Sequence, residues 1–356
     1  MPTALDAEKL NAFAGKMIGV LNQSALALMT SLGHRTGLFD AMARLTAPAT
    51  THQIAAEAKL SERYVREWLG SMVTGGVVEY DAITHTYRLP PEHAAFLTRA
   101  AAPNMASSAQ WLAVLGSAED DLVKAFAHGG GVKYGAYHRF HEVMAEASAE
   151  TVVAALHEHI LPVVPDLPDM LAEGIDVLDI GCGSGLAMIA LAQLFPASRF
   201  TGYDLSPEAI RGAREEAARR GLKNVRFEDR DLTNLNETST YDLITAFDAI
   251  HDQAQPDRVL ANIRAALRPS GVFLMQDISG SSHLAADMKH PLGPFLYGIS
   301  CMLCMSVSLA YGGAGLGAMW GKETALSMLK EAGLGRVTVR ELPHDMLNFY
   351  YIAYPG

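Results

Sequence analysis

A glycine-rich segment, VLDIGCGSG at residues 177–185, is the first place where residue types and spacing could hold a ligand. Its three glycines let the backbone turn sharply and come close to a bound group, and the start of the next helix offers unpaired amides. Such a turn alone also serves dinucleotides. About 23 residues after Gly181, however, the next apolar run ends in GYD, so that Asp204 stands where a carboxylate can bind both hydroxyls of a ribose. The spacing therefore predicts a nucleoside site.

A third apolar run, VRFEDRD, extends this site. It places Asp231 and Leu232 beside the neighbouring strand end, where they suit an adenine amino group and ring face. With Asp179 and Asp204, this makes three acidic positions at the carboxyl ends of predicted strands, where open α/β sheets bind ligands. The alternative is three surface aspartates and an ordinary tight turn.

The elements that must position these residues alternate between strands and helices after Glu173. Strand followed by helix, repeated, predicts right-handed crossovers and a parallel sheet covered on both faces. The last two apolar runs are close enough to form a hairpin. We therefore expect an α/β, Rossmann-like sheet of about seven strands, mostly parallel with the last strand antiparallel. The runs are IDVLDI, RFTGYDL, VRFEDRD, YDLITAF, GVFLMQDI, RVTVREL and NFYYIAYP.

VLDIGCGSG, GYDLS, DRDL and LRPSG, in this order and spacing, resemble the class I S-adenosylmethionine-dependent methyltransferases, and the resemblance covers residues 174–356. The pattern G-x-G-x-G and the closing hairpin both favour the methyl donor over a nicotinamide. The resemblance implies S-adenosyl-L-methionine as cofactor. The predicted cofactor-binding residues are Asp179, Gly181, Cys182, Gly183, Gly185, Asp204, Leu205, Asp231, Leu232 and Phe247.

The segment DAIHDQAQPDRVL at 248–260 is similar to the one in which small-molecule O-methyltransferases with an N-terminal winged helix keep a general base. The resemblance assigns that role to His251, which Asp252 follows. A histidine suits the task, because its unperturbed pKa of about 6.5 matches proton removal from a phenol or thiol. FHEVMAEAS at 140–148 is similar to the segment before the cofactor domain in the same enzymes, and the whole chain resembles actinobacterial winged-helix methyltransferases. The alternative is that His251 only caps the helix starting near Pro256.

Residues 291–321 form a stretch of 31 residues without Asp, Glu, Lys or Arg. Its part most able to form a membrane-spanning helix, FLYGISCMLCMSVSLAY, is shorter than the roughly 20 apolar residues that a bilayer needs, and it contains serines. As a metal clip, Cys301 and Cys304 lack a second ligand pair, so we expect no metal. The remaining interpretation is an insertion that lines an apolar acceptor pocket. The predicted lining residues are Phe295, Tyr297, Cys301, Met302, Met305, Met319 and Trp320.

A second aromatic segment, YGAYHRFH at 134–141, supplies further pocket candidates: Tyr134, Tyr137, His138 and His141. The favoured function is methyl transfer to the oxygen or sulfur of a small, largely apolar acceptor with His251 as base. Transfer without a base, to an amine or thiolate, is the lesser possibility, with these four residues only shaping the pocket.

The N-terminal residues predict a different fold. Apolar positions spaced by three and four indicate a long amphipathic helix over residues 6–33, and residues 52–73 indicate two helices broken at Lys59–Ser61, with Ser61 as N-cap. GGVVEYDAITHTYRL adds a wing, giving a winged helix-turn-helix. We expect domains at 1–100, for dimerisation, at 101–172, a helical connector over the active site, and at 173–356, for cofactor binding, with the insertion at 279–321.

A winged helix raises the alternative of a DNA-binding regulator that senses S-adenosylmethionine. Residues 1–100 contain nine basic and nine acidic side chains, so they carry no net positive field for phosphates. An enzyme needs His251 or an equivalent, whereas a sensor does not. We therefore expect a homodimer acting on a small-molecule acceptor, without nucleic acid.

Composition sets the remaining limits. The chain has 356 residues, 28 basic and 39 acidic side chains, a formal charge of -11 and three cysteines. Such a charge repels nucleic acid, and three cysteines cannot form a disulfide framework. Charges in MPTALDAEKLNAF occupy the place of a signal peptide's apolar core, so we expect a cytoplasmic protein without a membrane segment.

Overall fold

The computed structural model describes residues 5–356 and divides the chain into two compact units, the first up to Ala113 and the second from Val114 to Gly356. Each unit is described by itself. The first four residues of the N-terminal segment considered above lie outside the described part.

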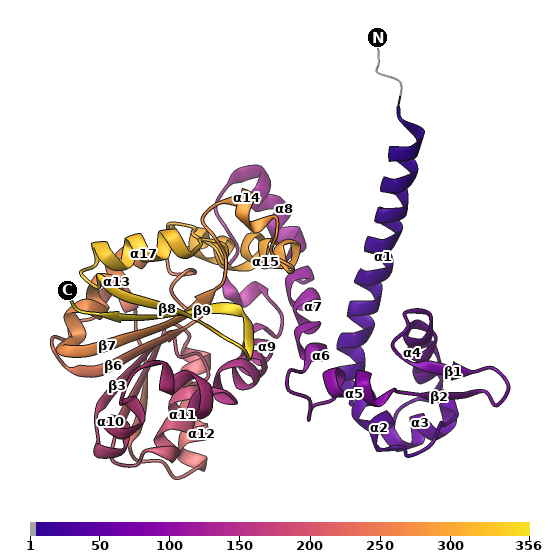
Figure 1. The fold of residues 1–356 in the computed structure, drawn as a ribbon, viewed down its shortest axis with the longest axis horizontal. Coiled ribbons are helices and arrows are strands. Elements are labelled where there is room, and N and C mark those ends of the chain that lie inside the picture. Colours follow the sequence, from indigo (N-terminus) through magenta and orange to yellow (C-terminus); the bar gives the residue numbers. More distant parts are fainter. Residues whose placement is uncertain (1–4) are drawn as a thin grey trace. The chain divides into compact units, whose positions relative to one another are not determined.

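The first unit begins with the long helix α1, Ala7–Thr36 (Figure 1). Asp6 caps its start by accepting hydrogen bonds from the amides of Glu8 and Lys9, and Gly37 ends it in a left-handed conformation. The predicted helix is confirmed and extends slightly further. Residues 5–356 leave its apolar stripe largely uncovered, since Phe13 is 60% and Leu21 70% exposed.

A helix-turn-helix and a wing follow, as predicted. Helix α3, Thr51–Ala58, ends at Lys59 in a left-handed conformation, and α4, Glu62–Thr74, begins after Ser61. Ser61 occupies the N-cap position, but its hydroxyl accepts no capping hydrogen bond. Strands β1, Glu79–Asp81, and β2, Thr86–Arg88, pair antiparallel as the wing. The remaining helices are α2 (Leu38–Arg44), α5 (Pro91–Leu97) and α6 (Met105–Ser108), and the boundary between the two units falls within α7 (Gln110–Gly116).

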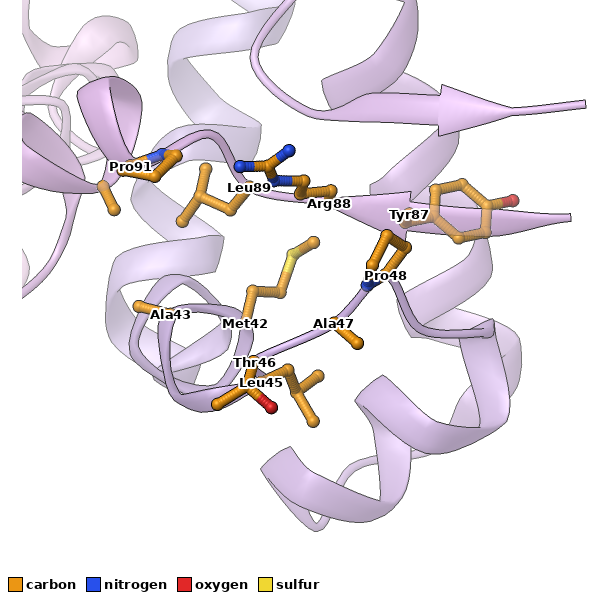
Figure 2. A pocket seen from close by; sticks show the side chains of 11 residues that line it. Met42, Ala43, Leu45, Thr46, Ala47, Pro48, Tyr87, Arg88, Leu89 and Pro91 are labelled. Atoms are coloured by element: carbon orange, nitrogen blue, oxygen red, sulfur yellow. The ribbon is translucent and has the colours of Figure 1, made fainter. Parts of the chain in front are cut away.

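Aromatic packing holds this unit together, because the rings of Phe39 and Trp68 meet edge to face at 5.2 Å in its core. A hollow of about 500 Å³ opens beside this core, between the end of α2, the wing strand β2 and the start of α5 (Figure 2). Met42, Tyr87 and Arg88 are among its lining residues. None of the predicted cofactor or catalytic residues borders it.

The second unit is built on a seven-stranded sheet with the order β5-β4-β3-β6-β7-β9-β8. Strands β5, β4, β3, β6 and β7 are parallel to one another, and β9 pairs antiparallel with both β7 and β8. The predicted sheet, with its antiparallel last strand and closing hairpin, is confirmed. The strands are β3 (Asp176–Ile180), β4 (Arg199–Asp204), β5 (Val225–Asp229), β6 (Tyr241–Phe247), β7 (Leu267–Ile278), β8 (Arg336–Leu342) and β9 (Asp345–Tyr354).

Helices cover both faces of this sheet (Figure 1). On one face, α10 (Leu167–Glu173), α11 (Leu186–Leu194) and α12 (Pro207–Arg219) bury Leu171, Met188 and Ile210 against it. On the other, α13 (Pro256–Ala266) and α17 (Lys322–Glu331) bury Leu260 and Leu329. Two apolar layers thus fix the strands, and their carboxyl ends are held at one edge.

Helical segments precede the sheet, interrupted at the predicted glycine loop after His128. These segments are α8 (Glu119–His128), η1 (Tyr134–Ala136), α9 (Phe140–Ser148), the π-helical η2 (Ala149–Val153) and η3 (Leu156–Ile160), and η4 (Leu161–Val163). The short η5 (Leu232–Asn234) follows β5.

The predicted insertion at 279–321, of which residues 291–321 are the uncharged stretch, lies between β7 and α17. It contains α14 (Leu284–Asp287), α15 (Gly293–Ile299), the π-helical η6 (Ser300–Cys304) and α16 (Met305–Ala310). Among the described residues, Gly293–Ala310 is the one helical stretch long and apolar enough to cross a membrane. Length and composition alone are weak evidence, and β7 before the insertion and β9 after it pair in one sheet, which a single crossing would separate.

Candidate active site

The glycine turn after β3 is formed as the sequence predicts. Gly181, Gly183 and Gly185 all have positive φ, at 67°, 51° and 70°. A Cβ at Gly181 would lie 2.5 Å from that of Ala249, and one at Gly185 would lie 2.4 Å from the ring of Phe227. Around a Cβ at Gly183, by contrast, no atom lies within 4 Å. The turn is therefore packed tightly at both ends and open in the middle, where a ligand can approach the backbone.

Asp204 lies at the end of β4, directly against this turn. Its carboxylate accepts hydrogen bonds from the amide of Gly183 (2.8 Å) and from that of Ser206 (2.8 Å). Each oxygen keeps a second lone pair. The glycine turn and Asp204, which lie about 23 residues apart in the sequence, are thus in direct contact.

Asp179, on β3 beneath the turn, is buried and accepts a hydrogen bond from Thr245 (2.6 Å). Burial raises its pKa to about 7, although the Thr245 bond opposes the shift. Cys182 is close to the sheet, since a Cβ on Gly202 would lie 2.8 Å from its sulfur. Burial, with Asp179 and Asp204 nearby, raises the pKa of this thiol, so Cys182 is an inert thiol.

The four residues predicted for the adenine side lie in different surroundings. Asp231 is exposed and accepts hydrogen bonds from its own turn, from Thr233 and Asn234, which hold its pKa low. Leu232 is 4% exposed and packs into the core beside β6. Leu205 is 54% exposed and Phe247 is half-buried at the end of β6. Adenine contacts by these four residues stay a prediction.

The aromatic segment 134–141 approaches the same edge. The hydroxyl of Tyr134 donates a hydrogen bond to Asp252, and its ring stacks on Phe140 at 4.7 Å. A ring nitrogen of His141 lies 3.5 Å from the hydroxyl of Ser206, which follows Asp204. Burial raises the pKa values of both Tyr134 and Asp252.

The other two candidates in this segment, Tyr137 and His138, differ from each other in burial. Tyr137 is buried and donates to the carbonyl of Met302 in the insertion (2.5 Å), whereas His138 is exposed. Tyr137 therefore ties the segment to the insertion.

His251, the predicted base, is 3% exposed and lies just past β6. Its Nδ1 is 2.7 Å from Oδ1 of Asp277, on the neighbouring strand β7. The indole nitrogen of Trp320 donates to the same oxygen (3.0 Å), as does the amide of Ile278 (2.8 Å). The buried carboxylate of Asp277 is thus held by two donors besides the imidazole, which is the arrangement expected of a carboxylate that orients a catalytic base.

The electrostatics of this pair favour a charged imidazole. Burial opposes protonation of His251, but the carboxylate of Asp277, and then the thiol of Cys304, outweigh it and raise the pKa of His251 above its ordinary value. The thiol of Cys304 is thus close to the His251 side chain. The imidazole and its carboxylate thus lie at the same edge of the sheet as the glycine turn.

The insertion residues divide into two groups. Trp320 is buried on Asp277, and Cys301, Met302 and Met305 are half-buried on η6 and α16, next to the His251 neighbour Cys304. Tyr297 instead donates to Asp287 on α14 (2.8 Å), Phe295 is half-buried on α15, and Met319 is 8% exposed beside Gly280.

Sequence reasoning missed Asp277 and Asp248, both near His251. Asp277 ends the run GVFLMQDI at a strand's carboxyl end, so the rule that selected Asp204 could have selected it. Asp248 directly follows the run YDLITAF, so the same rule could have selected it, but its place next to Asp277 depends on how β6 and β7 pair.

Comparisons with known proteins agree with this architecture. Residues 24–99 match the Rv2258c-like winged HTH domain, and residues 171–333 match a methyltransferase domain. The second unit therefore carries a methyltransferase domain, the class that its fold and glycine turn indicate. More particularly, the chain joins a winged HTH domain of the Rv2258c-like type to it.

Individual relatives share limited sequence identity with this chain. The chain is 31% identical over 108 residues to the ubiquinone biosynthesis O-methyltransferase of Coxiella burnetii (strain Dugway 5J108-111), a match covering 30% of this chain and 45% of that protein. The chain thus spans less than half the length of that curated relative. Human N-acetylserotonin methyltransferase, solved with S-adenosylmethionine, is 16% identical with a TM-score of 0.68 over 100% of both chains. Mitomycin 7-O-methyltransferase is 18% identical with a TM-score of 0.69 over 98% of this chain and 100% of that one. These structures share the fold.

The residues present fit S-adenosylmethionine. The open face of Gly183 leaves room against the backbone, and Asp204 retains lone pairs for ribose hydroxyls. The buried carboxyl group of Asp179 accepts a hydrogen bond from Thr245, and the half-buried one of Asp252 accepts a hydrogen bond from Tyr134. Both donors are uncharged, which suits a ligand that carries a sulfonium and an ammonium.

Proposed function

We propose that this protein is an S-adenosylmethionine-dependent methyltransferase acting on a small, largely apolar acceptor, with O- or S-methylation favoured and His251 as general base. One observation carries the proposal. The glycine turn with Asp204 and the His251–Asp277 pair follow the carboxyl ends of four adjacent strands, β4, β3, β6 and β7. A donor site and a proton acceptor thus share one edge of the sheet, as a two-substrate transfer requires.

S-adenosylmethionine supplies an electrophilic methyl group on its sulfonium when bound. The chain's own residues bind, orient and remove a proton. Asp277 holds the imidazole through Nδ1, which leaves Nε2 as the atom to accept a proton from a hydroxyl or thiol. Because the pKa of His251 is raised, its neutral form increases with pH above 6.5, and turnover should rise with it.

The acceptor class is inferred from the insertion. Cys301, Met302 and Met305 are half-buried on the π-helix and the turn after it, near the thiol that contacts His251. Apolar, polarisable side chains favour an apolar acceptor with one ionisable group. A preference for polar amines in a substrate screen would contradict this part of the proposal.

The regulator hypothesis has less support. On α4, Arg63 pairs with Glu67 (2.5 Å) and Arg66 pairs with Glu62 (2.7 Å), so the recognition helix has few free cations for phosphates. Asp81 at the wing adds a negative charge.

We further propose that the protein is a homodimer through α1. Phe13, Leu21 and Leu28 are 60%, 70% and 44% exposed on one long helix, and a second copy of the stripe is its natural cover. Light scattering tests this directly.

The deciding experiment is calorimetry of the purified chain with S-adenosylmethionine and S-adenosylhomocysteine, followed by a mass-spectrometric screen of phenols and thiols for the gain of one methyl group. We expect binding of both nucleosides and abolished binding in Asp204→Ala. Absence of binding by the wild type would refute the proposal. Binding without transfer to any compound, together with DNA retardation at micromolar protein, would favour the regulator.

A further inference from the structure

Asp248, directly after β6, combines three unusual properties. Its φ is 51°, a left-handed conformation that is uncommon for a residue other than glycine. Its Oδ1 is buried without a hydrogen-bond partner. One of its carboxylate oxygens, one of Asp277 and a ring nitrogen of His251 all lie within 4.8 Å of one another. Left-handed non-glycine residues occur at functional sites, where the surroundings hold them in place.

The partner oxygen also lacks a bond. Oδ1 of Asp277 accepts three hydrogen bonds, but its Oδ2 is buried with none, and the residue is 0% exposed. An unpaired buried oxygen costs about 1–3 kcal/mol. Both unpaired oxygens, Oδ1 of Asp248 and Oδ2 of Asp277, would be satisfied if one of the two carboxyl groups were protonated and donated a hydrogen bond to the other, directly or through a water.

We propose that Asp248 is a positioning residue for the methyl transfer: its carboxyl group, held by the left-handed backbone, donates a hydrogen bond to Asp277 and so fixes the carboxylate that orients His251. This inference rests on the proposed function, since it assigns the second layer of the same base. Asp248 itself touches neither substrate in this account.

The charges around Asp248 agree with a protonated carboxyl. Burial, followed by the carboxylate of Asp277, raises its pKa to about 8, while His251 lowers it. Asp345, on β9, and Asp252 also act on it, both in the raising direction. Tyr350 faces it as well, with its hydroxyl donated to Asp345 (2.8 Å). One imidazolium cannot balance both the buried carboxylate of Asp277 and a charged Asp248 whose Oδ1 is buried, so a neutral, protonated Asp248 is favoured.

Two substitutions separate this role from simple charge. Asp248→Asn keeps the shape, keeps a donor and tolerates the left-handed backbone. Asp248→Gly removes the carboxyl group without adding backbone strain. The matched control is Asp242→Asn, at the opposite end of the same strand, whose carboxylate bonds the amide of Asp176 (3.0 Å) and the guanidinium of Arg268.

The readout is the titration of the His251 ring followed by NMR in histidine-labelled protein, assigned by its loss in His251→Ala. It needs neither donor nor acceptor, so it stays informative if the proposed function fails. We expect Asp248→Asn to titrate like the wild type. We expect Asp248→Gly to titrate at higher pH, by up to about one unit, because Asp277 then loses a neutral donor and attracts the imidazolium more strongly. Asp242→Asn should lower thermal stability without moving the titration.

Three outcomes would overturn the inference. If both Asp248 variants lowered the His251 midpoint alike, Asp248 would be an ionised charge partner. If neither variant moved it, Asp248 would have no link to the base. If the purified protein held a stoichiometric divalent metal that Asp248→Asn abolished, the three side chains would be a cation site instead. With an active acceptor in hand, Asp248→Gly should reduce turnover by about 10–100-fold, with rescue in Asp248→Asn.

Discussion

Replacing Asp277 by Asn tests the centre of the site through stability alone. The structure predicts a strong effect, because Asp277 is fully buried, lies 2.7 Å from Nδ1 of His251 and accepts two further hydrogen bonds. Removing one member of a buried ion pair costs about 3–5 kcal/mol, because the other charge stays uncompensated. Once His251 is neutral, only a charge-assisted hydrogen bond of about 1.5–3 kcal/mol is lost.

The sign of the pH dependence follows from the raised pKa of His251. A histidine whose folded-state pKa lies above its unfolded value contributes stability that is fully present below about pH 6.5 and is lost as pH rises through the folded-state pKa. The destabilisation by Asp277→Asn should therefore be largest near pH 6 and should shrink toward alkaline pH.

Urea unfolding followed by circular dichroism measures this, with wild type, Asp277→Asn, His251→Ala and the double variant at pH 6 and at pH 9. The coupling energy from the cycle isolates the pair. His344→Ala is the control, because burial lowers the pKa of His344, so its contribution has the opposite sign and is lost as pH falls. A coupling energy of zero at pH 6, or one that grows with pH, would refute the reasoning.

The other predictions concern the base, the glycine turn and the long helix. His251→Ala should leave S-adenosylmethionine affinity unchanged in calorimetry while turnover falls by at least about 100-fold; equal turnover would remove the base assignment. Gly185→Ala should lower the free energy of unfolding by about 2–4 kcal/mol, because the added Cβ would lie 2.4 Å from the Phe227 ring and the φ of residue 185 is 70°. The control Gly212→Ala, which has open space around it inside a helix, should be neutral or stabilising. A Gly185→Ala variant as stable as the wild type would contradict the packed turn. Leu21→Asp on α1, at a site 70% exposed within the chain, should give monomers in light scattering with unchanged helix content; an unaltered mass would place any subunit contact elsewhere.

Local sequence patterns were sufficient for most of the framework. The apolar, β-rich runs and their intervening helices predicted every strand of the large sheet, because burial on both faces leaves a strong apolar signal in a run. The glycine turn and Asp204 could be paired from spacing, since a parallel crossover brings consecutive strand ends to one edge. Capping was less well predicted: Ser61 has the right position, but its side chain makes no capping bond.

The partners of the candidate base could not be derived in this way. Asp277 lies 26 residues after His251 and Trp320 a further 43 after Asp277, yet all three meet in one hydrogen-bonded cluster. Leu232, predicted from its position after a strand, begins η5 and packs into the core, and its contact with adenine stays a prediction.

By itself, the sequence determined the two folds, the order of strands and helices along the chain, and the edge of the sheet at which chemistry can occur. These features follow from the apolar periodicity of each segment and from the fixed handedness of the strand–helix–strand crossovers. Only the tertiary structure decided which carboxylate holds His251 and that Asp248 stands beside it. The physical reason is that strand pairing between β6 and β7, and the return of the insertion to place Trp320, are set by packing between distant segments.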